Sequence, residues 1–288
     1  MMSYFGDPEF AERFLSSRRE TAGVTASWII KLADISLGQR VIDLCCGPGL
    51  ISQHLAERVG PEGEVLGVDA SAAMIELARR NVTARNARFI EGAAYALPSL
   101  VTTPVDCVVA TSAWQNFLLD QERIVPAVRG VLKPSGRFAF DVRLRETADE
   151  ETSGGPPMMR FWQRVITLLR EEYPDVALSE QGKFGPFGAG RSGWRSYGRE
   201  DIDHDVALME GSGFRLAKWE EVAGSPFAGA WSGRQRWRVD YWLSRTAPGL
   251  SAESRTKILD EVAEEAQTRR SGAQPQVTTV YVVMEASR

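Results

Sequence analysis

Apolar and polar positions in the first half of the chain follow a strand, turn and helix order. Residues 41–44 form a largely apolar run that leads into a glycine-rich turn at 47–49. Residues 50–59 then repeat their apolar side chains at helical spacing, and a second apolar run at 65–68 ends at Asp69. Strand, glycine turn, helix and strand in this order predict the opening unit of a nucleotide-binding α/β sheet.

The residues around the glycine-rich turn restrict the nucleotide that it can bind. Glycines let the backbone approach a ligand closely, but Ser52 replaces the last glycine of the dinucleotide fingerprint and Pro48 stiffens the turn. Asp43 stands four residues before the first glycine, where an acid would repel a pyrophosphate but suits a cationic amino-acid ligand. Asp69, at the tip of the second strand, is expected to accept hydrogen bonds from a ribose diol. The pattern favours S-adenosylmethionine over NAD.

Four ordered segments resemble the core of class I S-adenosylmethionine-dependent methyltransferases, particularly the small-molecule group that includes the ubiquinone and menaquinone C-methyltransferases. They are VIDLCCGPG (41–49), VLGVDAS (65–71), FIEGAAYALP (89–98), and VDCVVATSAWQNF (105–117) followed by VLKPSGRFAFDV (131–142). The resemblance implies an α/β fold with a Rossmann-like, doubly wound sheet of seven strands, the last of them antiparallel. It also implies N-terminal helices, lid insertions after strands five and six, and S-adenosyl-L-methionine as cofactor.

The resemblance assigns the cofactor contacts to the tips of the first four strands. The expected contacts are Asp43, Leu44, Gly47, Gly49, Asp69, Ala70, Met74, Ala93, Ala94 and Thr111. The family usually carries Gly-Asp-Ala in the third segment, with the Asp side chain on the adenine amino group. This chain has Gly92-Ala93-Ala94 instead, so we expect backbone groups to serve there and adenine recognition to be somewhat weaker.

Candidates for acid–base chemistry are few. The histidines are His54 and His204, and both are expected on the surface. Relatives often carry a histidine after strand four, but this chain has Gln115-Asn116, so no imidazole base is expected there. Asp141, at the end of strand five, and Tyr197 are the candidate catalytic residues. A reaction driven by proximity alone stays open for an amine, phenolate or enolate nucleophile.

The cysteines are not expected to bind a metal. Cys45, Cys46 and Cys107 form no CxxC pattern and have no histidine beside them. We therefore predict that they are reduced core residues.

The chain is predicted to have four parts. They are an N-terminal helical cap (1–35), the cofactor-binding core (36–142), an insertion or lid (143–198), and the C-terminal part of the sheet (199–288) with a helical insertion at 228–272. The cap is predicted as two helices, 8–20 and 24–33. Residues 182–198 combine glycines with aromatic rings, which favours a lid that orders over a ligand.

Aromatic residues in the flanking segments suggest the acceptor. Phe10, Phe14, Trp114, Gln115, Trp194 and Trp237 are the expected substrate-binding residues. They predict a pocket for a small, largely apolar or aromatic metabolite, although the same rings could simply pack the insertions onto the core. Arg191, Arg195 and Arg234 are candidates to anchor an acidic substituent. Whether O, N or C is methylated stays open.

Composition limits the other partners. A net charge of −4 gives no drive toward nucleic acid or anionic membranes, and no apolar run reaches about 18 residues. We expect a cytoplasmic protein with no membrane partner, and a homodimer is compatible with the sequence. The main alternative is a cofactor-binding protein of the same fold that catalyses a pericyclase-type reaction. An RNA methyltransferase is disfavoured because no Asn-Pro-Pro-aromatic motif follows strand four, and a nicotinamide oxidoreductase comes last.

Overall fold

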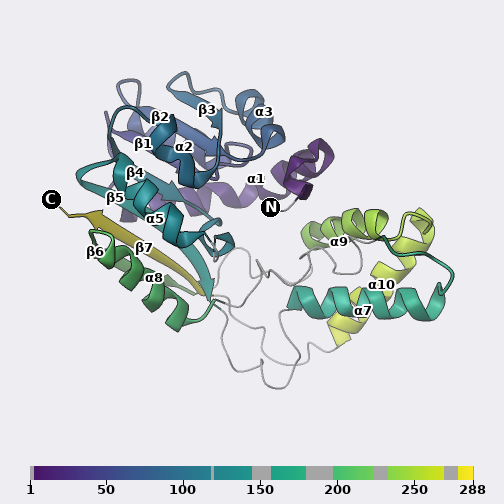
Figure 1. Cartoon of the computed structure of the whole chain (residues 1–288). Helices are drawn as coiled ribbons and strands as arrows, with labels where there is room; N and C mark the ends of the chain where they lie inside the picture. The colour runs from purple at the N-terminus through teal and green to yellow at the C-terminus, as the bar shows by residue number, and fades with distance from the viewer. Residues whose placement is uncertain are drawn as a thin grey trace.

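The centre of the protein is a seven-stranded mixed β-sheet with the strand order β3-β2-β1-β4-β5-β7-β6 (Figure 1). The strands are β1 Arg40–Leu44, β2 Glu64–Asp69, β3 Ala87–Glu91, β4 Val105–Ala110, β5 Leu132–Leu144, β6 Phe214–Val222 and β7 Thr278–Ala286. Strands β1 to β5 run parallel, whereas β7 is antiparallel to both β5 and β6. The predicted doubly wound sheet with an antiparallel last strand is confirmed.

The computed structural model describes residues 3–117, 120–144, 157–179, 197–223, 233–268 and 278–287. Within these ranges, no helix is both long enough and apolar enough to cross a bilayer.

Helices cover both faces of the sheet, because side chains alternate between the faces along each strand. One face carries α1 Pro8–Leu32, α2 Leu50–Val59 and α3 Ala72–Asn81, and the other carries α4 Leu97–Leu100, α5 Gln121–Val131 and α8 Arg199–Gly211. On β5, Ala139 packs toward α1 and α2, while Phe138 and Phe140 pack toward α5 and α8. Asp141 therefore lies on the α1 side, at the end of the strand where ligands bind in such sheets.

Helix α1 is continuous, so the prediction of two separate helices, 8–20 and 24–33, is wrong. Asp7 caps its N-terminus by accepting a hydrogen bond from the Glu9 backbone N–H at 2.8 Å. Gly23 lies inside the helix, where glycine costs about 1 kcal/mol relative to alanine. Burial of Ala22 and Ala26 against the core offsets this cost. Tertiary packing outweighs the local preference for a break.

Three helices from the two insertions pack together into what we call the helical unit. They are α7 Pro157–Glu172, α9 Gly233–Thr246 and α10 Ala252–Thr268. Figure 1 shows them grouped beside the N-terminal end of α1 and away from the sheet. Arg164 forms a two-pronged ion pair with Glu265 and so joins α7 to α10. The domain boundaries drawn from the sequence, and the lid predicted at 182–198, stay predictions, since most of that segment lies outside the described residues.

Candidate cofactor and acceptor site

The glycine-rich turn and the acid after β2 form one cradle. Gly47 and Gly49 both have left-handed φ angles, 52° and 78°. The Gly47 backbone N–H donates to Asp69 Oδ2 at 2.9 Å, and the Ser71 N–H donates to Asp69 Oδ1 at 2.9 Å. A Cβ at Gly49 would lie 2.6 Å from Val82 Cγ2, so only glycine fits between α2 and α3. The Asp69 carboxylate is thereby fixed beside the turn that is predicted to meet the ligand.

Asp43 lies below this cradle with 1% of its surface exposed. The Ser52 hydroxyl donates to its Oδ2 at 2.6 Å. Burial raises the pKa of Asp43 to about 7; the bond from Ser52 opposes the rise, and the charge of Asp69 adds to it. A cation nearby would stabilise the ionised form. The cradle therefore suits a ligand with a positively charged amino-acid part, as predicted for S-adenosylmethionine. Ser52, the residue that departs from the dinucleotide fingerprint, is the one that hydrogen-bonds Asp43.

Cofactor binding is expected to strengthen as the pH rises through 7. Without ligand, about half of the Asp43 carboxyl groups are protonated at pH 7, and a bound cation drives that proton off. The apparent affinity should therefore increase about fivefold between pH 6 and pH 7. Calorimetry in buffers of different ionisation enthalpy would measure the proton released on binding. Asp43→Asn should remove this release, and an unchanged release in that variant would contradict the assignment.

The same proton has the opposite effect on the stability of the ligand-free protein. The folded-state pKa of Asp43 is raised above its unfolded value because of burial, so the folded state binds the extra proton. Its contribution to stability is fully present below the unfolded pKa and is lost as the pH rises through about 7.

The remaining predicted cofactor residues lie around this cradle. Leu44 and Met74 are buried, Met74 among side chains of α1 and the helical unit, whereas Ala70 is exposed and Thr111 is half-buried after β4. Ala94 begins a short 3-10 helix, Ala94–Ala96, directly after Ala93. Their contacts with the cofactor stay predictions.

The tips of β4 and β5 form the neighbouring part of the edge. Asp141 is 1% exposed, and its Oδ1 accepts a hydrogen bond from the Ser112 backbone N–H at 2.6 Å. Burial raises the pKa of Asp141, although the charges of Arg143 and Arg18 oppose the rise. Arg143 Nη2 donates to Ser112 Oγ at 3.0 Å, and the Arg143 backbone N–H donates to Gln115 Oε1 at 3.4 Å. A carboxyl group with a raised pKa is a stronger base than a surface acid, so Asp141 stays the candidate proton acceptor.

An aromatic cluster from α1 and α9 adjoins the glycine-rich turn. The Phe10 ring centre lies 6.1 Å from that of Phe14 and 5.2 Å from that of Trp237. The nearest atom to the Cβ position of Gly47 is Phe14 Cε1, at 3.9 Å. The sequence predicts Phe10 and Phe14 of the N-terminal segment and Trp237 of the C-terminal insertion as substrate residues, and the fold brings the three rings together. Phe10 is 1% exposed, so it packs behind the other two rings.

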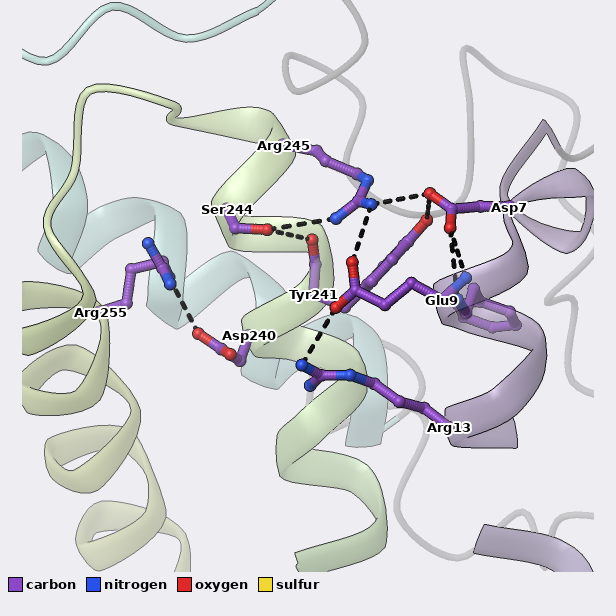
Figure 2. Close-up of polar contacts among 9 residues, drawn as sticks. Asp7, Glu9, Arg13, Asp240, Tyr241, Ser244, Arg245 and Arg255 are labelled. Atoms are coloured by element: carbon purple, nitrogen blue, oxygen red, sulfur yellow. Dashed lines mark hydrogen bonds and ion pairs between the residues drawn. The ribbon is translucent and has the colours of Figure 1, made fainter. Parts of the chain in front are cut away.

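Polar contacts hold α9 against the start of α1 (Figure 2). Tyr241 Oη and Arg245 Nη2 each donate to Asp7 Oδ2 at 2.7 Å. Burial raises the pKa of Asp7, but the bonds from Tyr241 and Arg245 outweigh it and hold the pKa below its usual value. Asp7 therefore caps α1 and docks the helical unit at once. The sequence indicated only the cap.

The position of Trp114 differs from the one predicted for a substrate-binding residue. Its side chain is 0% exposed and packs against Phe138 and Phe140 on the α8 side of the sheet, with ring centres 5.3 and 5.0 Å away. The indole Nε1 donates to the buried Asp205 at 2.7 Å. The prediction that Trp114 lines the acceptor pocket is wrong, because its ring and its donor are both used inside the core.

Trp114→Phe is expected to lower the free energy of unfolding by about 1–3 kcal/mol, because it removes the buried hydrogen bond to Asp205. Cofactor affinity should not change. Urea unfolding and calorimetry would measure the two quantities. Trp219→Phe is the matched control: Trp219 Nε1 donates to Glu221 at the surface, so that loss should stay within about 0.5 kcal/mol. A loss of methyl-transfer activity in Trp114→Phe without a loss of stability would restore the original prediction, which placed Trp114 in the acceptor pocket.

Tyr197, the second catalytic candidate, also lies elsewhere than predicted. It is 2% exposed, lies in the core with Trp114, and its hydroxyl accepts a hydrogen bond from Gln121 Nε2 at 3.4 Å. The expectation that it belongs to a lid over the ligand is therefore wrong. Trp194, Arg191 and Arg195 lie outside the described residues.

The remaining sequence candidates have simple placements. His54 and His204 lie at the surface as predicted, with side chains 40% and 75% exposed. Cys46 and Cys107 are buried as predicted, and burial raises the pKa of both thiols, whereas Cys45 is only half-buried. Among the described residues, no cluster of three or more His, Cys, Asp or Glu side chains could hold a metal ion.

Comparison with known proteins identifies the family. Residues 41–136 match the model of a methyltransferase domain family. The demethylmenaquinone methyltransferase of Thermus thermophilus is 34% identical over 167 residues, which cover 56% of this chain and 73% of that protein. The chain is a class I S-adenosylmethionine-dependent methyltransferase. S-adenosyl-L-methionine is its cofactor, in agreement with the acids and glycines of the cradle.

Other matches of this methyltransferase agree at the level of the fold. It spans only 47% and 59% of two further demethylmenaquinone methyltransferases. An S-adenosylmethionine-dependent methyltransferase structure from Aquifex aeolicus has a TM-score of 0.51 at 14% identity, covering 96% of this chain and 98% of that one. The [4+2]-cyclase SpnF has a TM-score of 0.55 at 15% identity, covering 91% of this chain and 80% of that one.

Proposed function

We propose that the protein methylates a small, largely apolar or aromatic metabolite. The observation that carries the proposal is the position of Phe14. Its ring lies 3.9 Å from the Cβ position of Gly47 in the glycine-rich turn and stacks on Phe10, which in turn packs on Trp237. An acceptor that stacks on this cluster lies beside the cradle and next to the edge formed by Asp141. We therefore place the acceptor at the aromatic wall formed by Phe10, Phe14 and Trp237, and not beside Trp114.

The residues of the site divide the work among them. When bound, S-adenosylmethionine supplies a methyl group on a good sulfonium leaving group. Asp43 and Asp69 orient the cofactor's charged and hydroxylated parts, and the rings of Phe10, Phe14 and Trp237 exclude water from the acceptor. Asp141 takes the proton of an acceptor hydroxyl or amine when the acceptor is not already ionised. Most of the rate comes from proximity, since the chemistry needs little else.

Production of S-adenosylhomocysteine tests the proposal. The protein is incubated with S-adenosylmethionine and separate panels of phenols, aromatic amines and enolisable aromatic ketones, and the methylated product is identified by mass spectrometry. Phe14→Ala should lower kcat/KM by about tenfold or more, because it removes the ring between turn and acceptor. The control Phe117→Ala removes a partly buried ring that packs on Trp114, on the other face. Tight cofactor binding without methyl transfer to any acceptor would favour the pericyclase-type alternative.

The other partner and location expectations rest on the sequence alone. A nucleic-acid substrate is disfavoured by the net charge of −4, and salt-dependent RNA binding would revive it. The homodimer and the cytoplasmic location stay predictions. Sedimentation of the purified protein would decide the first.

A further inference from the structure

Two arginines from different helices meet at the Phe14 ring. The Arg18 Cζ, on α1, and the Arg238 Cζ, on α9, each lie 5.4 Å from the ring centre. The same Arg238 Cζ lies 5.6 Å from the Trp237 ring centre. Guanidinium groups stack on aromatic faces and also bind carboxylates with two parallel hydrogen bonds. The aromatic wall of the proposed acceptor site is therefore lined by positive charge.

A third arginine lies near Asp141, on the sheet. Arg143, near the end of β5, lies on the same side of the strand as Asp141, and the charges of both Arg143 and Arg18 act on that acid. Arg143 is held by Ser112 Oγ at 3.0 Å and is partly buried.

We propose that the acceptor is an aromatic acid whose carboxylate is bound by Arg18, Arg143 and Arg238 while its ring stacks on Phe14. The inference rests on the proposed function and adds the class of substrate. Arg18 of α1 and Arg238 of α9 meet at the Phe14 ring, and the charges of Arg18 and Arg143 both act on Asp141. Guanidinium groups beside an aromatic ring suit a flat anion. These three arginines differ from Arg191, Arg195 and Arg234, the anchors suggested by the sequence.

The test compares acids with their neutral esters. The protein is saturated with S-adenosylhomocysteine, and binding of hydroxybenzoate and hydroxynaphthoate isomers, each beside its methyl ester, is measured by calorimetry. We expect the preferred acid to bind about tenfold or more tightly than its ester. Arg18→Gln and Arg143→Gln should each weaken binding of that acid about tenfold and leave ester binding unchanged.

Controls separate lost charge from lost structure. Arg13→Gln removes the same charge from α1 at an exposed position, where Arg13 pairs with Glu9, and should not change acid binding. Arg143→Lys keeps the charge but loses the paired N–H donors of the guanidinium group. It should therefore bind acid more weakly than the wild type and more tightly than Arg143→Gln. Thermal unfolding and affinity for S-adenosylhomocysteine report whether each variant is folded.

Two outcomes overturn the inference while leaving the proposed function intact. In one, esters bind as tightly as acids. In the other, no acid binds although S-adenosylhomocysteine does. Failure of the wild-type protein to bind S-adenosylhomocysteine would instead contradict the proposed function itself.

Discussion

Gly47→Val is expected to weaken S-adenosylmethionine binding by about a hundredfold or more. The φ angle of Gly47 is +52°, a region that β-branched residues avoid at a cost of about 1–3 kcal/mol. A side chain there also enters the space between the turn and Phe14, whose Cε1 lies 3.9 Å from the Cβ position. Relief of the strain would move the Gly47 N–H away from Asp69. Isothermal titration calorimetry would measure the loss.

Gly38→Val is the control that separates the effect of backbone strain from the effect of a side chain in the cofactor site. Gly38 has a φ angle of +76°, and no atom lies within 4 Å of its Cβ position, so valine meets the same backbone penalty without a steric clash. It lies between α1 and β1, away from the cradle. We expect both variants to lose stability by a similar amount and only Gly47→Val to lose cofactor binding. Equal cofactor affinity in both variants would show that the turn at 47–49 does not meet the ligand.

Asp69→Ala is expected to weaken cofactor binding by about 1.5–3 kcal/mol, or roughly 10- to 150-fold. The carboxylate accepts hydrogen bonds from Gly47 and Ser71 and so stands fixed at the tip of β2, where it can bind a ribose diol. The fold should remain intact, because the strand register does not depend on this side chain. Circular dichroism would verify the fold, and calorimetry the affinity.

Asp106→Ala is the matched control. Asp106 also accepts a backbone hydrogen bond, from the Arg40 N–H at 2.8 Å, and it also accepts from Lys133 Nζ at 2.6 Å. It lies at the opposite edge of the sheet, near the starts of β1 and β4. This variant should lose stability and keep its cofactor affinity. Unchanged affinity in Asp69→Ala would remove Asp69 from the site.

The cradle could be predicted from sequence because its signals are local. Parallel strands are buried on both faces, so β1 and β2 read as apolar runs, and the turn between β1 and α2 needs glycines for its left-handed backbone. The acid at Asp69 follows its strand directly. All of these features lie within about thirty residues and depend on backbone geometry rather than on distant partners.

The direction in which a side chain points after a strand ends could not be predicted in the same way. Trp114 follows β4 in a short 3-10 helix, and nothing nearby in the sequence tells whether its ring turns toward the ligand edge or into the core. Its hydrogen-bond partner, Asp205, lies 91 residues further along the chain. The continuity of α1 has a similar cause, since burial of Ala22 and Ala26 outweighs the local signal of Gly23.

By itself, the sequence determined the sheet, the cofactor and the cradle that is predicted to hold it, because periodicity, turn chemistry and strand-end acids are properties of short segments. Only the tertiary structure decided which residues of α1 and α9 lie next to the cradle. Asp7 on α1 receives Tyr241 and Arg245 from α9, more than 230 residues away, and that docking places Arg238 beside Phe14. Contacts across such separations depend on how whole helices pack, and no local pattern of residues encodes that packing.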